Sequence, residues 1–310
     1  MSIATQPLAV PRSPLTLARD YAELTKLRVT SLVVMTAWCG YYFGAARSGV
    51  SSFSWGLSHT LIGVGLVAGG TAALNEVMEA DIDGHMRRTA RRPLPTGRMS
   101  MMHALIAGIG MTLGGALYLG LALNALTALL ALATAAVYLG AYTPLKKIHP
   151  ICTFVGAFPG AMPGVLGWTA ARGRLEWGAL AMFAIVFFWQ FPHFFSIAWL
   201  YREDYAAGNI HMLPVVESDG RSTARQIIFY SVALIPVTLA PTVLGMAGAA
   251  YGVGASLLGL TMLWFGVRLA SVKAPIGSAL SKQRARQLLQ ATVFYLPLLF
   301  LVMMLNSVSS

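Results

Sequence analysis

Residues 104–142 read ALIAGIGMTLGGALYLGLALNALTALLALATAAVYLGAY, and this run contains no charged side chain. A single helix of this length would extend nearly 60 Å at about 1.5 Å per residue, roughly twice the thickness of a bilayer's hydrocarbon core. The run is therefore predicted to be a hairpin of two membrane-spanning helices that turns near Asn124. Such a hairpin favours an all-α protein embedded in a membrane, because helices satisfy their own backbone groups in lipid.

Similar charge-free runs lie on both sides of this hairpin. Residues 226–267 are also too long for one span and are predicted to turn within 245–254. Five other runs each have the length of one span, and they are residues 29–46, 57–74, 148–171, 177–201 and 287–310. The sequence thus predicts an all-α polytopic membrane protein with nine transmembrane helices. Residues 29–310 would form one transmembrane domain, and residues 1–28 would form a cytoplasmic N-terminal segment.

The composition supports a membrane protein. Of the 310 residues, 56% are hydrophobic and only 11% are charged, whereas soluble domains carry roughly 25% charged residues. This balance excludes a soluble enzyme and a disordered chain. The two cysteines, Cys39 and Cys152, both lie in apolar stretches, which argues against a disulfide framework and a thiolate metal site.

The basic residues predict the orientation of the chain. If the N-terminus is cytoplasmic, 19 of the 22 Lys and Arg residues fall in cytoplasmic loops, and only Arg47, Arg172 and Arg174 lie outside. This distribution follows the positive-inside rule and places the C-terminus outside. We expect a multi-pass protein of a bacterial plasma (inner) membrane. The net charge of +11 is divided among five short loops, so no nucleic-acid partner is expected.

Most of the 11 acidic residues gather in two cytoplasmic loops, 75–100 and 201–225. Each loop follows a single span and precedes a hairpin. The order of single helix, acidic loop, hairpin, basic loop and single helix therefore occurs twice, about 120 residues apart. Internal repeats in membrane proteins often place a site at their interface, so we expect the two acidic loops to share one.

The first acidic loop contains a pattern suited to a metal ion and a phosphate. Asn75, Glu79 and Asp83 recur every four residues, which places them on one face of a continuing helix. Their oxygens suit Mg²⁺, which takes carboxylates, waters and substrate phosphates. The four arginines of residues 87–92 suit phosphate oxygens, and Lys146 at the end of the first hairpin adds a point charge. Together they predict a site for a lipid-linked diphosphate.

The span predicted at residues 177–201 carries an ionisable side chain among apolar residues. His193 lies within FFWQFPHFF at residues 187–195, and a histidine inside a span indicates a function. A neutral imidazole contacts a haem iron or acts as an acid or base. The alternative is a core histidine bonded to a neighbouring backbone carbonyl.

Several blocks together resemble a known family. The pattern N-x3-E-x3-D at 75–83, followed by RRTARRPL at 87–94, resembles the first signature of the UbiA-type intramembrane prenyltransferases. The resemblance extends to the family's haem-farnesylating branch through YTPLK at 142–146, GAFPGAMPG at 156–164, QFPHF at 190–194, EDYAAG at 203–208 and MLPV at 212–215. Two positions depart from the family pattern: Glu79 replaces the usual aspartate, and Gly208 stands four residues after Asp204, where a second aspartate is usual.

The resemblance implies a UbiA-type prenyltransferase fold and a Mg²⁺-dependent reaction. A farnesyl group would pass from farnesyl diphosphate to a vinyl group of haem b, giving haem O and diphosphate. The implied site residues are Asn75, Glu79, Asp83 and Asp204 for metal and catalysis, Arg88, Lys146 and Arg202 for diphosphate, and His193 for haem. Membrane lipids and a downstream haem-modifying enzyme are further expected partners.

Two alternatives stay open at this point. One is a related prenyltransferase that acts on a quinone precursor or another aromatic acceptor, with the same fold and metal site. The other is a secondary transporter, because repeats with polar sites are typical of that class. The acids cluster at one membrane face rather than at the midplane, which argues against transport.

Overall fold

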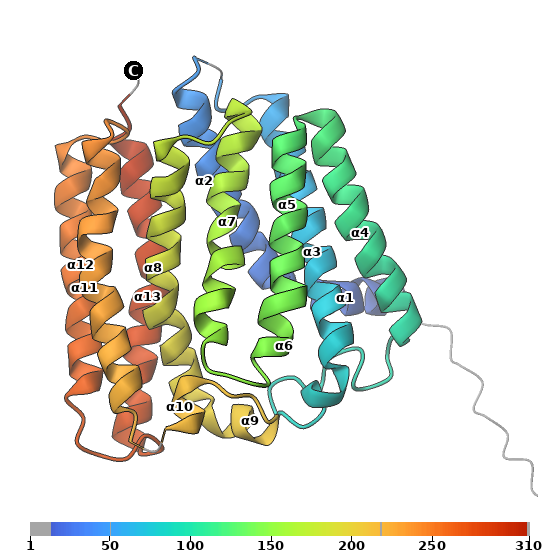
Figure 1. Ribbon diagram of the computed structural model, residues 1–310, viewed down its shortest axis with the longest axis vertical. Helices are drawn as coiled ribbons and strands as arrows, with labels where there is room; N and C mark the ends of the chain where they lie inside the picture. Colours follow the sequence, from blue (N-terminus) through green and yellow to red (C-terminus); the bar gives the residue numbers. More distant parts are fainter. Residues whose placement is uncertain (1–13, 50, 218, 309–310) are drawn as a thin grey trace, which may run out of the picture.

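The computed structural model describes residues 14–49, 51–217 and 219–308, and these form a bundle of long helices that run side by side (Figure 1). The long helices are α2 (Leu27–Ala46), α3 (Trp55–Asp83), α4 (Met101–Ala122), α5 (Ala125–Val137), α7 (Cys152–Arg172), α8 (Trp177–Leu200), α11 (Arg221–Val243), α12 (Ala249–Ala270) and α13 (Ala279–Leu305). Helix α5 continues through a π-helical turn, η1 (Tyr138–Tyr142), into α6 (Thr143–Leu145). Three short helices complete the described part: α1 (Pro14–Leu24), α9 (Arg202–Ala207) and α10 (Leu213–Val216).

The all-α polytopic fold is confirmed. Within the described residues, 8 helices are long and apolar enough to cross a membrane, counting Ala125–Leu145 as one. Helix α7 is a further long helix of 21 residues in the middle of the bundle, and it packs against α2, α5 and α8. Its glycines and prolines add little apolar surface. Helix α7 is therefore long enough to cross a membrane but less apolar than the other eight helices. The predicted nine helices are close to this count.

Several boundaries differ from the predicted ones. The first hairpin turns as expected, since Asn124 caps α5 and its Oδ1 accepts a hydrogen bond of 2.9 Å from Thr127 N. The second hairpin turns at residues 244–248, at the start of the expected stretch. Helix α13 begins at Ala279 rather than at residue 287, because its first turns carry charges that extend beyond an apolar span. Residues 1–13 lie outside the described part, but residues 14–24 of the N-terminal segment form α1.

Close packing between α2 and α7 explains the glycine-rich stretch at 156–164 and the residues after it. A Cβ atom on Gly40 would overlap the carbonyl of Gly164, and one on Gly167 would overlap the carbonyl of Ala37. Small residues let two helix backbones approach within membranes. The stretch is therefore part of the packing that holds α7 in the centre.

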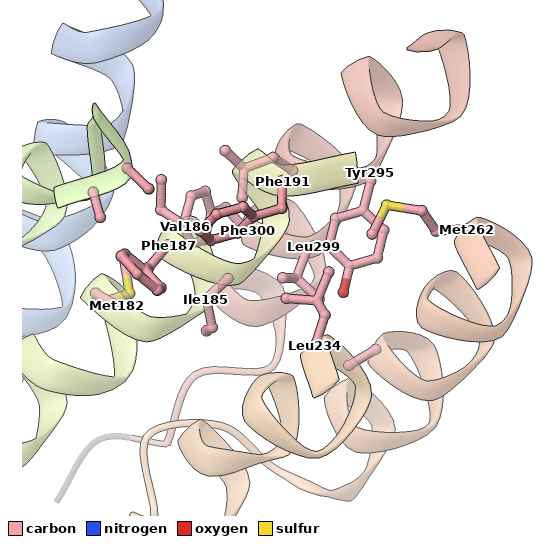
Figure 2. Packing of buried hydrophobic residues seen from close by; sticks show 14 of the residues in the cluster. Met182, Ile185, Val186, Phe187, Phe191, Leu234, Met262, Tyr295, Leu299 and Phe300 are labelled. Carbon is pink, nitrogen blue, oxygen red and sulfur yellow. The ribbon is translucent and has the colours of Figure 1, made fainter. Parts of the chain in front are cut away.

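The C-terminal half has a core of its own around α8 (Figure 2). Side chains of α8 and α13 share one buried cluster, and Phe187 of α8 contacts Phe154 and Phe158 of α7, with ring centroids 5.7 Å and 5.1 Å apart. Phe191 also stacks on Tyr230 of α11, with ring centroids 3.6 Å apart. This packing fixes α8 and thereby the second acidic loop that follows it.

Both acidic loops lie at the same end of the bundle, opposite the end of α13 (Figure 1). The second loop contacts the chain after α6, where His211 N donates a hydrogen bond of 2.8 Å to the carbonyl of Lys146. It also contacts the first loop, because a Cβ atom on Gly208 would lie 2.9 Å from Met86 Cγ. A side chain at position 208, such as the usual second aspartate, would therefore require Met86 and Ile82 to shift.

Candidate active site

The last turns of α3 carry the predicted polar face. Asn75, Glu79 and Asp83 all lie on this helix, and their residues are only 1%, 4% and 1% exposed. The expected continuation of the helix through Asp83 is therefore confirmed. Buried carboxylates on one face are costly unless opposite charges accompany them.

Each polar group on this face has a cationic partner. Lys26 Nζ donates to Asn75 Oδ1 at 2.5 Å, and Lys146 Nζ forms an ion pair with Glu79. Arg92 Nη1 lies 2.6 Å from Asp83 Oδ2. Three cations thus face two carboxylates and one amide on this helix.

Lys26 reaches the site through an unusual backbone conformation. It lies between α1 and α2 with a φ of +48°, in the left-handed region that costs energy for a residue with a Cβ. Helix α1 is fastened nearby, because Arg98 pairs with Asp20 and, at 2.6 Å, with Glu23. Loss of water around the Lys26 ammonium, together with the neighbouring Arg92, lowers the pKa of Lys26 to about 8.

Lys146 is placed by the π-helical turn η1. Pro144 has no N–H to continue the regular helical pattern, and π-helical turns are frequent at functional sites. Thr143 Oγ1 donates to the carbonyl of Tyr138 at 2.9 Å and accepts from Asn75 Nδ2 at 3.2 Å. The end of α5–α6 is thereby joined to the polar face of α3.

The other predicted phosphate ligands lie around this face. Arg88 is exposed, and its guanidinium carbon lies 5.7 Å and 5.6 Å from the ring centroids of Tyr201 and Tyr205, so it joins the first acidic loop to the second. Arg202 instead donates to the carbonyl of Pro214 at 2.6 Å. Its position fastens α9 to α10 rather than to the α3 face.

Asp204 lies half-buried on α9, and among the described residues its carboxylate accepts no hydrogen bond from the α3 face or its cations. Within the part of the chain that the structure describes, no three His, Cys, Asp or Glu side chains lie together as a ready-made metal cage.

His193 lies apart from this face, within α8. Its Nδ1 is 2.9 Å from Thr292 Oγ1 of α13, and its ring stacks on Trp189 with centroids 4.7 Å apart. The Thr292 hydroxyl donates to the carbonyl of Leu289 at 2.7 Å, so we assign the donor role in the first contact to His193 Nδ1–H. Its Nε2 then carries a lone pair that suits a metal or a proton. The partner is a hydroxyl and not the backbone carbonyl of the alternative interpretation.

Comparison with known sequences decides the family. The profile of the UbiA prenyltransferase family matches residues 33–282. The chain belongs to this family. The resemblance inferred from the motifs is confirmed.

Relatives of this UbiA family member match it over nearly the whole chain. A protein named protoheme IX farnesyltransferase from Koribacter versatilis is 62% identical and covers 99% of both chains. A protein of the same name from Solibacter usitatus is 48% identical and covers 93% of this chain and 98% of its own.

Solved structures share the fold at low identity. Digeranylgeranylglyceryl phosphate synthase superposes with a TM-score of 0.75 at 15% identity, covering 93% of this chain and 98% of its own. A UbiA homologue from Archaeoglobus fulgidus bound to GPP and Mg²⁺ gives a TM-score of 0.60 at 14% identity, covering 92% and 99%. These likenesses confirm the UbiA-type fold.

Two residues of this UbiA-type site were not singled out from the sequence. Lys26 belongs to a segment predicted to be only a cytoplasmic lead-in, and its left-handed conformation has no sequence signal. Arg92 is one of four arginines in residues 87–92, and only the path of the loop shows that it is the one that pairs with Asp83.

Proposed function

We propose that this UbiA-family protein is a Mg²⁺-dependent transferase that moves the farnesyl group of farnesyl diphosphate onto a vinyl group of haem b, giving haem O and diphosphate. The acceptor is inferred from the relatives named protoheme IX farnesyltransferase, one of which is 62% identical along 99% of the chain. The observation that carries the proposal is the buried polar face of α3 with its three cations.

The charges of this face suit a diphosphate. Lys26, Arg92 and Lys146 already neutralise the α3 side chains, and a diphosphate takes its place among the same cations. Arg88 on its two tyrosine rings provides a further guanidinium for the phosphate oxygens. We assign diphosphate binding to these four residues and give Arg202 a role in holding the second acidic loop.

The donor set of the α3 face fits Mg²⁺. Asn75, Glu79 and Asp83 offer hard oxygens, and Asp204 would add one from α9. Among the described residues the fully buried Glu76 forms no ion pair, and its carboxylate contacts only the backbone of Leu94, which leaves further donors beside this face. Mg²⁺ usually binds through one or two carboxylates plus substrate phosphates rather than in an all-protein cage, so a ready-made cluster of three acids is not required.

Bound Mg²⁺ would supply charge that stabilises the diphosphate as it leaves. The protein's cations act on the same group: as the allylic C–O bond breaks, its electron pair goes to the diphosphate, and Lys26, Lys146 and Arg92 stabilise the charge that develops. The allylic cation forms a carbon–carbon bond with the haem vinyl group, and a water molecule completes the hydroxyethylfarnesyl group with release of a proton. Burial of the face keeps bulk water away until the carbon–carbon bond forms. We assign contact with haem to His193.

The alternatives differ in substrate or in class. A quinone precursor or another aromatic acceptor would leave the diphosphate site unchanged. Transport is disfavoured, because both acidic loops lie at one end of the bundle (Figure 1). We further propose that this end is cytoplasmic in a bacterial inner membrane, that residues 29–310 form a single domain, and that a haem-modifying enzyme consumes the product.

The test incubates the purified protein with haem b, farnesyl diphosphate and Mg²⁺, and analyses the extracted haem by mass spectrometry. We expect a haem heavier by one farnesyl group and one water, with at least a hundredfold loss in Asp83→Ala and with EDTA. Unchanged haem with consumed farnesyl diphosphate would show that the acceptor is wrong, and a fully active His193→Ala would remove the haem role of that residue. If neither substrate changes, the prenyl-transfer proposal fails, and Mg²⁺-independent uptake into proteoliposomes would favour the transporter.

A further inference from the structure

The last part of the chain carries cations without acids. Residues 220–310 contain seven Lys and Arg residues and no Asp or Glu. Two of the seven have partners upstream: Lys282 Nζ lies 2.8 Å from Glu203 Oε1, and Arg221 Nε lies 3.1 Å from Asp219 Oδ2. Among the described residues, no ion pair joins Arg268, Lys273 or Arg284 to a carboxylate.

These three cations line one hollow. It has a volume of about 490 Å³ and lies where the end of α12 meets the start of α13. The rest of its lining is apolar or hydroxyl-bearing and includes Trp264, Val267 and Leu280. These three apolar residues are 53%, 43% and 46% exposed, so they face the surroundings of the bundle.

The two arginines of the hollow are held in place. The guanidinium carbon of Arg268 lies 4.5 Å from the ring centroid of Trp264, a cation–π contact that fixes its direction. Arg284 Nη1 donates to Gln287 Oε1 at 3.0 Å. Basic side chains that only set the orientation of a membrane protein would extend freely into water. Arg268 and Arg284 are instead held by neighbouring side chains at the edge of the hollow.

The hollow lies at a level where two environments meet. Its three exposed apolar residues and both arginines belong to α12 and α13, whereas Lys273 belongs to the connection between them, at the same end as the acidic loops (Figure 1). Basic pockets between transmembrane helices at this level recognise anionic headgroups. We propose that the hollow binds an anionic phospholipid, with its phosphodiester on Arg268, Lys273 and Arg284 and its acyl chains along Trp264, Val267 and Leu280. This site is separate from the α3 face and does not depend on the proposed reaction.

A bound lipid also has a structural consequence. It fastens the connection between α12 and α13, and α13 in turn holds the second acidic loop through the pair of Lys282 and Glu203. The lipid is therefore expected to raise the stability of the corner beside the active site without touching the substrates.

The experiment measures lipid binding to the full-length protein in detergent by native mass spectrometry, with equal amounts of palmitoyl-oleoyl phosphatidylglycerol and phosphatidylcholine. We expect selective retention of phosphatidylglycerol. Because a basic residue near an anionic surface is worth about 1 kcal/mol, the double variant Arg268→Gln/Arg284→Gln should weaken binding about 25-fold. The matched control is Arg225→Gln, which removes an exposed arginine of α11 outside the hollow and should retain the lipid.

Three results would overturn the proposal. Equal retention of both lipids would show that the apolar surface alone binds, and equal binding by the double variant and Arg225→Gln would place the lipid elsewhere. Displacement of the lipid by millimolar inorganic phosphate would identify a site for free oxyanions instead. If the double variant does not fold, the single variant Lys273→Gln on the exposed connection replaces it. We expect this variant to bind phosphatidylglycerol about fivefold more weakly.

Discussion

At the scale of single residues, Lys26 shows how a strained conformation serves a site. Its backbone adopts a φ of +48° although it has a Cβ, and such strain persists where the surroundings enforce it and where function benefits. The benefit here is an ammonium group 2.5 Å from the amide oxygen of Asn75. The strained backbone conformation of Lys26 thus places a cation at the proposed diphosphate site.

This interpretation predicts that activity and stability separate at position 26. Lys26→Gln should raise the KM for farnesyl diphosphate at least about tenfold, because a hydrogen bond to a charged group is worth about 1.5–3 kcal/mol. Lys26→Gly should lose activity to the same extent yet melt higher than Lys26→Gln, since glycine adopts positive φ without strain. Steady-state kinetics and thermal unfolding in detergent test both expectations.

Arg19→Gln is the matched control for Lys26. Arg19 is an exposed cation of α1 that pairs with Glu23 only on the surface, so its loss should leave the KM unchanged. An unaltered KM in Lys26→Gln would contradict the role of Lys26 in diphosphate binding. Recovery of activity by Lys26→Arg would show that the positive charge is what matters.

At the scale of helices and their connections, the turn between α7 and α8 is fixed by one carboxylate. Glu176 Oε2 accepts hydrogen bonds from Arg172 Nε at 2.9 Å and from Trp168 Nε1 at 3.1 Å, and its Oε1 accepts from Arg172 Nη2 at 3.0 Å. Arg172 also donates to the carbonyl of Arg47 at the end of α2. The hydrogen bonds from Arg172 chiefly, with Trp168 and Arg174 beside it, lower the pKa of Glu176 from 4.5 to about 2.

The lowered pKa predicts how stability depends on pH at this turn. A carboxylate with a depressed pKa stabilises the fold fully above about pH 4.5, and this contribution falls as the pH drops toward about 2. At neutral pH the variant Glu176→Gln should therefore melt at a lower temperature than the wild type, and its free energy of unfolding should be about 1–3 kcal/mol smaller. The difference should shrink steadily below pH 4.5 in thermal unfolding measured in detergent. A difference that is constant from pH 7 to pH 3 would show that the shape of the side chain, rather than its charge, holds the turn.

The elements were more predictable than their contacts. Charge-free runs give the spans, because charges are excluded from lipid, and four-residue spacing gives the polar face of α3. The sequence does not give α1, whose helix depends on its contacts with α3 and on Arg98, nor the early start of α13, whose first turns are charged. The family resemblance implies Arg202 as a phosphate ligand. In the structure its guanidinium donates to the carbonyl of Pro214, because α9 and α10 fold back on each other, and its role in phosphate binding stays a prediction.

At the scale of the whole molecule, charge divides the bundle into two unlike ends. One end carries both acidic loops, the cations of the active site and the hollow between α12 and α13. At the other end, Arg172 contacts the chain beside Arg47, and Arg174 pairs with Glu176. Arg12 lies outside the described residues, and for the other basic residues the 19 to 3 distribution expected from the sequence corresponds to a physical separation in the fold. This separation carries the proposal that the active-site end is cytoplasmic.

The orientation can be tested by labelling single introduced cysteines. Both native cysteines are buried, so a membrane-impermeant maleimide should react only with an added thiol. Ala206 of α9 and Ser51 at the opposite end are both exposed, and neither is assigned to a substrate. Ala206→Cys should react in inverted membrane vesicles and stay unlabelled in intact spheroplasts, while Ser51→Cys should show the reverse. The wild type, which should remain unlabelled in both, is the control. Labelling of Ala206→Cys from the outside would show that the bundle has the opposite orientation. Diphosphate would then bind on the wrong side for a cytoplasmic substrate, and the proposed topology would fail even if the chemistry were right.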